Sequence, residues 1–150
     1  MKLHKHFLKR LSFTVEIVGE DMELNPINEF SATMISKRME VNIGEKKLPL
    51  KLDRSEHMTY LEAALDEIQE REDQEGRHFT EEPEILAVPE RSLLVQDGIT
   101  EKKVRVITFL AITHHQGEEY FATIRGSIPD DAMLTTAFIQ SVFGTLRGMG

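Results

Sequence analysis

Hydrophobic and polar residues alternate along much of the first half of the chain, which is typical of half-buried β-strands. Phe13, Val15 and Ile17 alternate with polar neighbours, and Gly19 then ends the pattern. The same period recurs over residues 30–41. Between and after these patterns we expect a loop over 20–28 and a turn over 42–44. Leu48, Leu50 and Leu52 predict an irregular or edge strand, because Pro49 has no backbone N–H to donate to a neighbouring strand.

Two later segments change to the spacing of an amphipathic helix. The first follows Asp53–Ser55 and runs to about Arg71, with Gly76 as its stop. Its apolar stripe consists of Leu61, Ala64, Leu65 and Ile68, and its other face is acidic. The second helix follows Ser127–Asp130, which supplies an N-cap, an early proline and an acid, and it continues to Arg147 before Gly148.

The segment between the helices has the signature of a strand-rich core. Residues 104–113 read VRVITFLAIT and predict a central strand, because β-branched and aromatic side chains dominate both faces. Residues 120–125 follow a polar turn and predict its antiparallel partner. Strand-like pieces over 79–88 and 91–96 precede it, and Asp97–Gly98 is typical of a hairpin turn. We expect one α+β domain over residues 1–150, an antiparallel sheet flanked by helices in α/β/α layers.

The first twelve residues differ in charge from the rest of the chain. They carry four bases and no acid, whereas the whole chain has 18 bases and 26 acids and a net charge of −8. Their apolar residues fit either a short amphipathic helix or a strand beginning near Lys9. Packing on the chain's own sheet is the simpler interpretation; docking on an acidic partner or a membrane surface is the other. Under the docking hypothesis the candidate partner-binding residues are Leu3, Phe7, Leu8, Lys9 and Arg10.

Composition removes several classes of function. The chain has no cysteine, which excludes disulfides, thiolate metal sites and cysteine nucleophiles. The negative charge disfavours nucleic acid as a partner. Because no apolar run approaches about 18 residues, we expect no membrane insertion. The N-terminal segment lacks the uninterrupted apolar core of a signal peptide, so we expect a cytoplasmic chain.

Candidate catalytic and metal-binding groups are weak in the sequence. His114 and His115 would point to opposite faces of a strand, and His4 and His6 lack a third ligand nearby. We interpret Asp130–Asp131 as a charge pair at a helix N-terminus and Glu118–Glu119 as a solvated hairpin edge. Ser92 and Ser141 have no nucleophile-elbow context and no visibly paired histidine. The sequence therefore predicts no catalytic residue, no metal ligand and no cofactor.

The order of elements resembles the PsbP-like superfamily, which includes DcrB-type domains and the Ran-binding Mog proteins. The segment that carries the resemblance is Val104–Arg147, where a long apolar strand and a short turn precede EYFATIRGSIPDD and then LTTAFIQSVFGTLR. Residues 30–38 and 60–71 would match the early strand and the middle helix. The superfamily's usual Pro-Asp/Glu-Gly-Trp-like turn at the start is missing, since the chain has no tryptophan. The resemblance implies a non-enzymatic role in binding proteins, as in the effector chaperones of type VI secretion.

Three hypotheses of function follow. The first is a non-enzymatic, chaperone- or adaptor-like domain that holds a partner protein's segment in a groove between sheet and helix. The second is a small-ligand-binding protein or enzyme that uses a cavity under the C-terminal helix. The third is a homodimer formed through the hairpin of residues 104–113 and 120–125, if one of its strands lies at a sheet edge.

Overall fold

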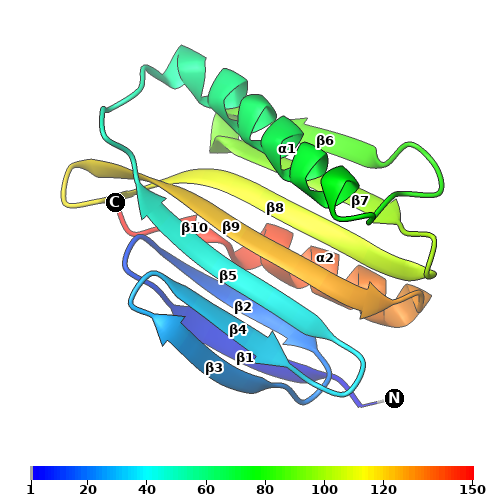
Figure 1. The fold of residues 1–150 in the computed structure, drawn as a ribbon. Helices are drawn as coiled ribbons and strands as arrows, with labels where there is room; N and C mark the ends of the chain where they lie inside the picture. The colour runs from blue at the N-terminus through cyan, green and yellow to red at the C-terminus, as the bar shows by residue number, and fades with distance from the viewer. Residues whose placement is uncertain (1) are drawn as a thin grey trace.

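A computed structural model describes residues 2–150 and places two helices and ten strands in layers (Figure 1). The strands are β1 His4–Lys9, β2 Phe13–Gly19, β3 Glu23–Asn28, β4 Ser31–Ile35, β5 Glu40–Lys47, β6 Glu84–Val88, β7 Leu93–Ile99, β8 Val104–His115, β9 Glu118–Pro129 and β10 Arg147–Gly148. The helices are α1 His57–Gln74 and α2 Ala132–Thr145, with short 3₁₀ turns at Arg54–Glu56 and Pro89–Arg91.

The strands form two antiparallel sheets. The larger has seven strands in the order β3-β4-β5-β9-β8-β7-β6, and the smaller has three in the order β1-β2-β10. The sequence patterns predict a single sheet, so the division into two is a finding of the structure. Strand β2 pairs with β1 on one side and with the two-residue β10 on the other. Beyond β10, Thr145 and Ser141 of α2 hydrogen-bond to the backbone of Glu16 and Val18, so β2 does not pair with the larger sheet.

The larger sheet is covered on both faces, which confirms an α+β fold with a sheet between helical layers. We call the face that meets α2 and the smaller sheet the back face, and the face that meets α1 the front face (Figure 1). The back core is the larger, and α2 lies close to it: a Cβ added to Gly126 would come 2.6 Å from Cζ of Phe138. The front core is small and is built around Leu61 and Leu65 of α1.

Helix α1 covers only part of the front face. In Figure 1 it lies in front of β6, β7 and β8, whereas β3, β4 and β5 have no helix before them. Its last turns are held to β9 by an ion pair between Glu72 and Arg125 at 3.3 Å. Neither α1 nor α2 has the length and apolarity needed to cross a bilayer.

The strongest sequence patterns are confirmed. Residues 104–113 and 120–125 lie within β8 and β9, which pair in the centre of the larger sheet. The acidic helix begins and ends near its predicted bounds, with Gly76 at a φ of +80° just beyond it. The second helix is also present, but Ser127 and Pro129 belong to β9, and the N-cap is Asp131, whose side chain accepts a hydrogen bond from Leu134 N–H at 2.9 Å.

Several predictions for the first half are wrong. Of the two alternatives for the basic segment, the helix is wrong; the segment forms strand β1, which ends at Lys9 and does not begin there. Residues 20–28 contain β3, where Pro26 is tolerated because the strand is an edge with a register irregularity. Residues 42–44 lie inside β5, and the Leu48–Leu52 segment forms no strand.

Two predicted boundaries in the second half are also wrong. Asp97–Gly98 lies inside β7 and not in a turn. Gly98 is needed there for space, because a Cβ would come 2.6 Å from the Phe79 ring. The last helix ends at Thr145, and Arg147–Gly148 pair with β2 as β10.

Candidate functional site

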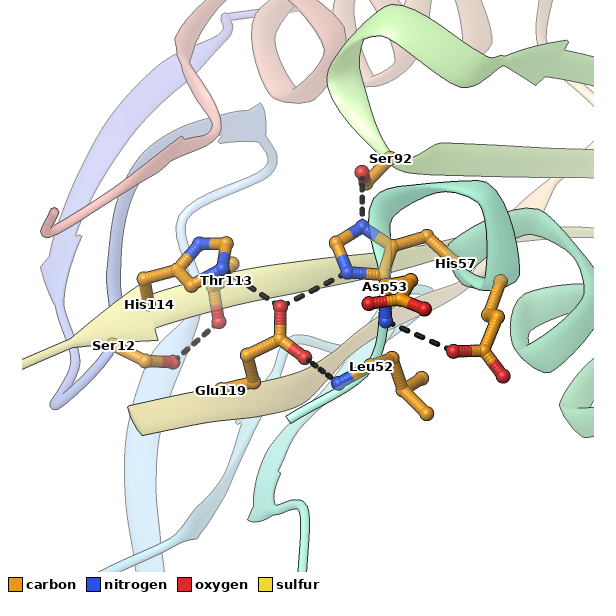
Figure 2. A network of polar contacts seen from close by, with 9 residues as sticks. Ser12, Leu52, Asp53, His57, Ser92, Thr113, His114 and Glu119 are labelled. Atoms are coloured by element: carbon orange, nitrogen blue, oxygen red, sulfur yellow. Dashed lines mark hydrogen bonds and ion pairs between the residues drawn. The ribbon is translucent and has the colours of Figure 1, made fainter. Parts of the chain in front are cut away.

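A buried carboxylate, Glu119 of β9, joins three segments at one end of the larger sheet (Figure 2). Its side chain is 2% exposed. Oε1 accepts a hydrogen bond from Leu52 N–H at 2.6 Å, and Oε2 lies 2.9 Å from Nε2 of both His57 and His114. The carboxylate therefore holds the linker before α1, the first residue of α1 and the end of β8.

The bonding continues through His57 to Ser92, whose Oγ lies 2.7 Å from Nδ1 of the imidazole (Figure 2). An ionised carboxylate can only accept hydrogen bonds, so both histidines present a protonated Nε2 to Glu119. Nδ1 of His57 accepts the hydroxyl proton of Ser92 when the imidazole is neutral and donates to Ser92 Oγ when it is charged. Ser92 itself has a left-handed backbone, with φ of 48°, which follows the 3₁₀ turn before β7.

The local fold explains why these side chains meet. His114 and Glu119 are direct cross-strand partners in the β8–β9 hairpin, so their side chains share the front face. The chain returns from β5 along this face before α1 starts, which brings Leu52 and His57 over the hairpin. Burial by itself raises the pKa of the Glu119 carboxyl, but the hydrogen bonds from Leu52, His114 and His57 outweigh it and hold that pKa below its usual value of 4.5.

A second buried carboxylate, Glu45 of β5, lies on the back face. It accepts hydrogen bonds from Leu11 N–H at 3.0 Å, from Ser12 N–H at 2.9 Å and from the Ser12 hydroxyl at 2.6 Å. Thr113 of β8 donates to Ser12 Oγ at 2.7 Å. This carboxylate anchors the turn between β1 and β2 to the larger sheet.

The order Ser92, His57, Glu119 is that of a hydrolase triad, in which the histidine takes the serine proton and the carboxylate orients the histidine. Ser92 is 5% exposed and His57 is 4% exposed, so in this conformation no substrate carbonyl can approach the hydroxyl. The arrangement as it stands orients and fixes α1. Within residues 2–150 no cluster of three histidines, cysteines or acids is suited to a metal ion.

Two interpretations of the sequence are corrected by this site. Glu119 is buried and is not part of a solvated hairpin edge, because the hairpin's front face is covered by His57 and the linker. Ser92 does have a histidine partner, which comes from a helix 35 residues away in the chain. Ser141 instead bonds to β2 and to its own helix.

The five candidate partner-binding residues do not form one exposed surface. Leu8 is 6% exposed and belongs to the back core, and Leu3 packs against it. Arg10 lies 3.8 Å from Glu45. Phe7, 69% exposed, and Lys9 point away from the core, so these two remain available to a partner.

The space under α2 is filled. Leu134, Phe138 and Val142 are fully buried there, and Phe138 packs edge-on against Phe109 at 6.2 Å between ring centroids. The condition for the hairpin dimer is not met, because β8 and β9 each pair with a strand on both sides and neither lies at a sheet edge.

A groove of about 550 Å³ runs between α1 and the β6 edge of the larger sheet. We call it the α1/β6 groove. The helix contributes Leu65, Asp66, Gln69 and Asp73, and the opposite wall consists of residues 78–83 with Ile85 of β6. Ile85 and its neighbour Leu86 are 58% and 53% exposed, which is unusual for consecutive large apolar residues of a strand.

The comparisons with known proteins show the fold. No protein-family model matches the chain, and no curated protein matches it in sequence. The structure is similar to one described as the crystal structure of LpqN involved in cell envelope biogenesis of Mycobacterium tuberculosis. The TM-score is 0.60 and the identity 12%, and the match covers 100% of this chain and 93% of that one. The chain has the same fold as LpqN.

Proposed function

We propose that this chain is a non-enzymatic protein-binding domain, chaperone- or adaptor-like, and that the α1/β6 groove holds a segment of a partner protein. The observation that carries the proposal is the groove itself, which lies between a helix and a sheet edge and exposes Ile85 beside it. Burial of such side chains on binding contributes about 25 cal/mol per Å² of apolar surface removed from water.

The test compares two edge strands of the same sheet. Tagged wild-type protein, Ile85→Lys and Ile27→Lys are used to recover proteins from native cell extract at low and moderate salt. Ile27 is a matched control, because it is 66% exposed on the opposite edge strand, β3. We expect the wild type and Ile27→Lys to recover the same protein and Ile85→Lys to lose it. Equal recovery by all three, or recovery of a small molecule only, would contradict the proposal.

An enzyme that uses Ser92 is the second candidate, because the bonds from Ser92 through His57 to Glu119 have the order of a hydrolase triad. The burial of all three side chains opposes it. A fluorophosphonate probe distinguishes the two functions. Labelling of the wild type that is lost in Ser92→Ala would establish a reactive serine, and the binding proposal predicts no labelling.

We also propose that the chain belongs to the PsbP-like superfamily and is cytoplasmic. The order of strands and helices supports the first statement. The charged segment His4–Lys9 is strand β1 of the folded domain and contributes Leu8 to the back core. Because LpqN is described as involved in cell envelope biogenesis, cell fractionation is the deciding measurement. Recovery with the envelope would contradict a cytoplasmic location.

A further inference from the structure

We propose that the partner segment is an extended chain that pairs with the free edge of β6 as an added strand, and that basic residues flank its apolar side chains. This inference rests on the proposed function, because it names the kind of segment that the α1/β6 groove would take. Strand addition uses the unpaired backbone groups of an edge strand for affinity and its side chains for specificity.

The β6 edge differs from two other free edges of the sheets. Strand β3, the opposite edge of the larger sheet, contains Pro26 and a register irregularity, both of which hinder pairing. Strand β1, an edge of the smaller sheet, carries Lys5 and Lys9 on its outward face, and lysine is a common protection against unwanted pairing. Strand β6 reads EILAV and has neither proline nor lysine.

Both faces of β6 offer an apolar contact to an added strand. Ile85 is the cross-strand partner of Gln96 and shares the front face with it, beside the groove. Leu86 is paired with Val95, which belongs to the back core, so Leu86 lies on the opposite face. An incoming strand with alternating side chains would therefore bury apolar surface above and below the sheet.

The charged residues around β6 indicate the net charge of the segment that would bind there. The titratable residues that line the groove are four carboxylates and one histidine: Asp66, Asp73, Glu81, Glu82 and His78. The histidine is 3.2 Å from Asp73. Glu84 starts the strand, whereas at its other end Glu90 is followed by Arg91 and its carbonyl accepts a hydrogen bond from Arg54, so the excess of acid lies at the Glu84 end. A second copy of this chain would bring a further net charge of −8 to this edge, whereas a basic segment is attracted to it.

The experiment measures binding of synthetic peptides to the full chain by fluorescence anisotropy. The probe is the labelled peptide KKVTVTVKK. The comparison peptides are EEVTVTVEE, two versions of the probe N-methylated at one or the other alternate set of backbone amides, and a helical peptide of the same charge. We expect the probe to bind at least tenfold more tightly than EEVTVTVEE and than at least one N-methylated version, with a clear loss of affinity between 50 and 300 mM salt.

Variants place the peptide on β6. The double variant Ile85→Lys/Leu86→Lys should weaken the probe at least tenfold, while Leu24→Lys/Ile27→Lys on β3 should leave its affinity unchanged. Amide hydrogen exchange should slow in residues 84–88 and not in 23–28 when the probe binds. This measurement separates pairing with the strand from general attraction to an acidic surface.

Other outcomes overturn the inference, and they are distinguishable from failure of the proposed function. If both N-methylated peptides, or the helical peptide, bind as tightly as the probe, strand pairing is excluded while a groove-binding function stands. Equal affinity for EEVTVTVEE would exclude the charge argument. A chain that is dimeric by sedimentation and becomes monomeric in Ile85→Lys/Leu86→Lys would identify a second copy as the occupant. The proposed function itself would fail if Ile85→Lys recovered the same partner from cell extract as the wild type does.

Discussion

Replacement of Glu119 by alanine tests whether the buried network holds α1 in place. The substitution removes the acceptor of three hydrogen bonds and leaves Leu52 N–H and two imidazole N–H groups without it. A hydrogen bond to an ionised group contributes about 1.5–3 kcal/mol, but three bonds to one carboxylate are not additive. Breaking a buried, charged network by removing one partner costs about 3–5 kcal/mol, and we expect that range.

The isosteric change Glu119→Gln should cost less. The amide oxygen can keep the bond from Leu52, and the amide NH₂ can donate to both histidines if each changes tautomer and presents an unprotonated Nε2. Neutral bonds then replace charge-assisted ones, at a cost of about 1–2 kcal/mol. The order alanine, glutamine, wild type in increasing free energy of unfolding is therefore part of the prediction.

The assay is urea-induced unfolding at pH 7, followed by far-UV circular dichroism because the chain has no tryptophan. A thermal scan gives a second readout: for a chain of this size each kcal/mol shifts the melting temperature by about 2–4 °C, so Glu119→Ala should melt roughly 6–20 °C lower. Glu118→Ala, at the neighbouring residue, is the matched control. The Glu118 side chain is 51% exposed and lies 3.4 Å from Lys47, and such an exposed ion pair contributes less than about 1 kcal/mol. If Glu119→Ala is as stable as Glu118→Ala, the network does not hold the fold.

Further predictions concern pH, packing and capping. A carboxyl whose pKa is lowered by folding stabilises the folded chain above its unfolded pKa and loses that effect as pH falls through the folded one, so the free energy of unfolding should fall below about pH 4.5. Glu20 adds to this fall because hydrogen bonds from Ser36 and Arg38 lower its pKa, and Glu119→Gln should flatten the fall in urea titrations at pH 3–7. Gly126→Ala should destabilise by about 1–3 kcal/mol in the same assay, because its Cβ would meet the Phe138 ring; Phe138→Leu should recover part of the loss, and an unchanged stability would mean that α2 shifts freely. Asp131→Ala should lower the free energy of unfolding by about 1 kcal/mol through loss of the α2 N-cap, and Asp130→Ala should lower it less. Equal melting temperatures for the two variants would contradict the capping role of Asp131.

The elements predicted best from sequence are those whose pattern has a single physical interpretation. Strand β8 is apolar on both faces because it lies at the centre of the sheet, and α1 has a helical stripe with a glycine stop. Strand β3, one edge of the larger sheet, escaped prediction, since an edge strand needs neither a buried face nor a full set of backbone donors. Strand β3 has six exposed residues and a proline, which is the composition of a loop.

The buried network could be found only in part. Once β8 and β9 are predicted as a hairpin, residues that flank the turn are cross-strand neighbours, so a pairing of His114 with Glu119 was within reach of the sequence. His57 and Ser92 join them through tertiary packing, and neither has a local motif. The sequence hypothesis included a groove between the sheet and a helix but not its position. Its position beside β6 depends on which half of the sheet α1 covers.

The buried network and the groove share one structural element, helix α1. Its first residue, His57, is bonded to Glu119 and Ser92, and its last turns are joined to β9 through Glu72 and Arg125. Burial lowers the pKa of the Arg125 guanidinium, and Glu72 opposes that effect and so favours its charge. Of the helix residues that line the groove, Leu65, Asp66 and Gln69 lie between His57 and Glu72, and Asp73 directly follows Glu72. A helix fixed at both ends offers a preformed wall, so binding needs little ordering of the helix and the affinity for a segment at β6 depends on contacts with Ile85, Leu86 and the acidic rim.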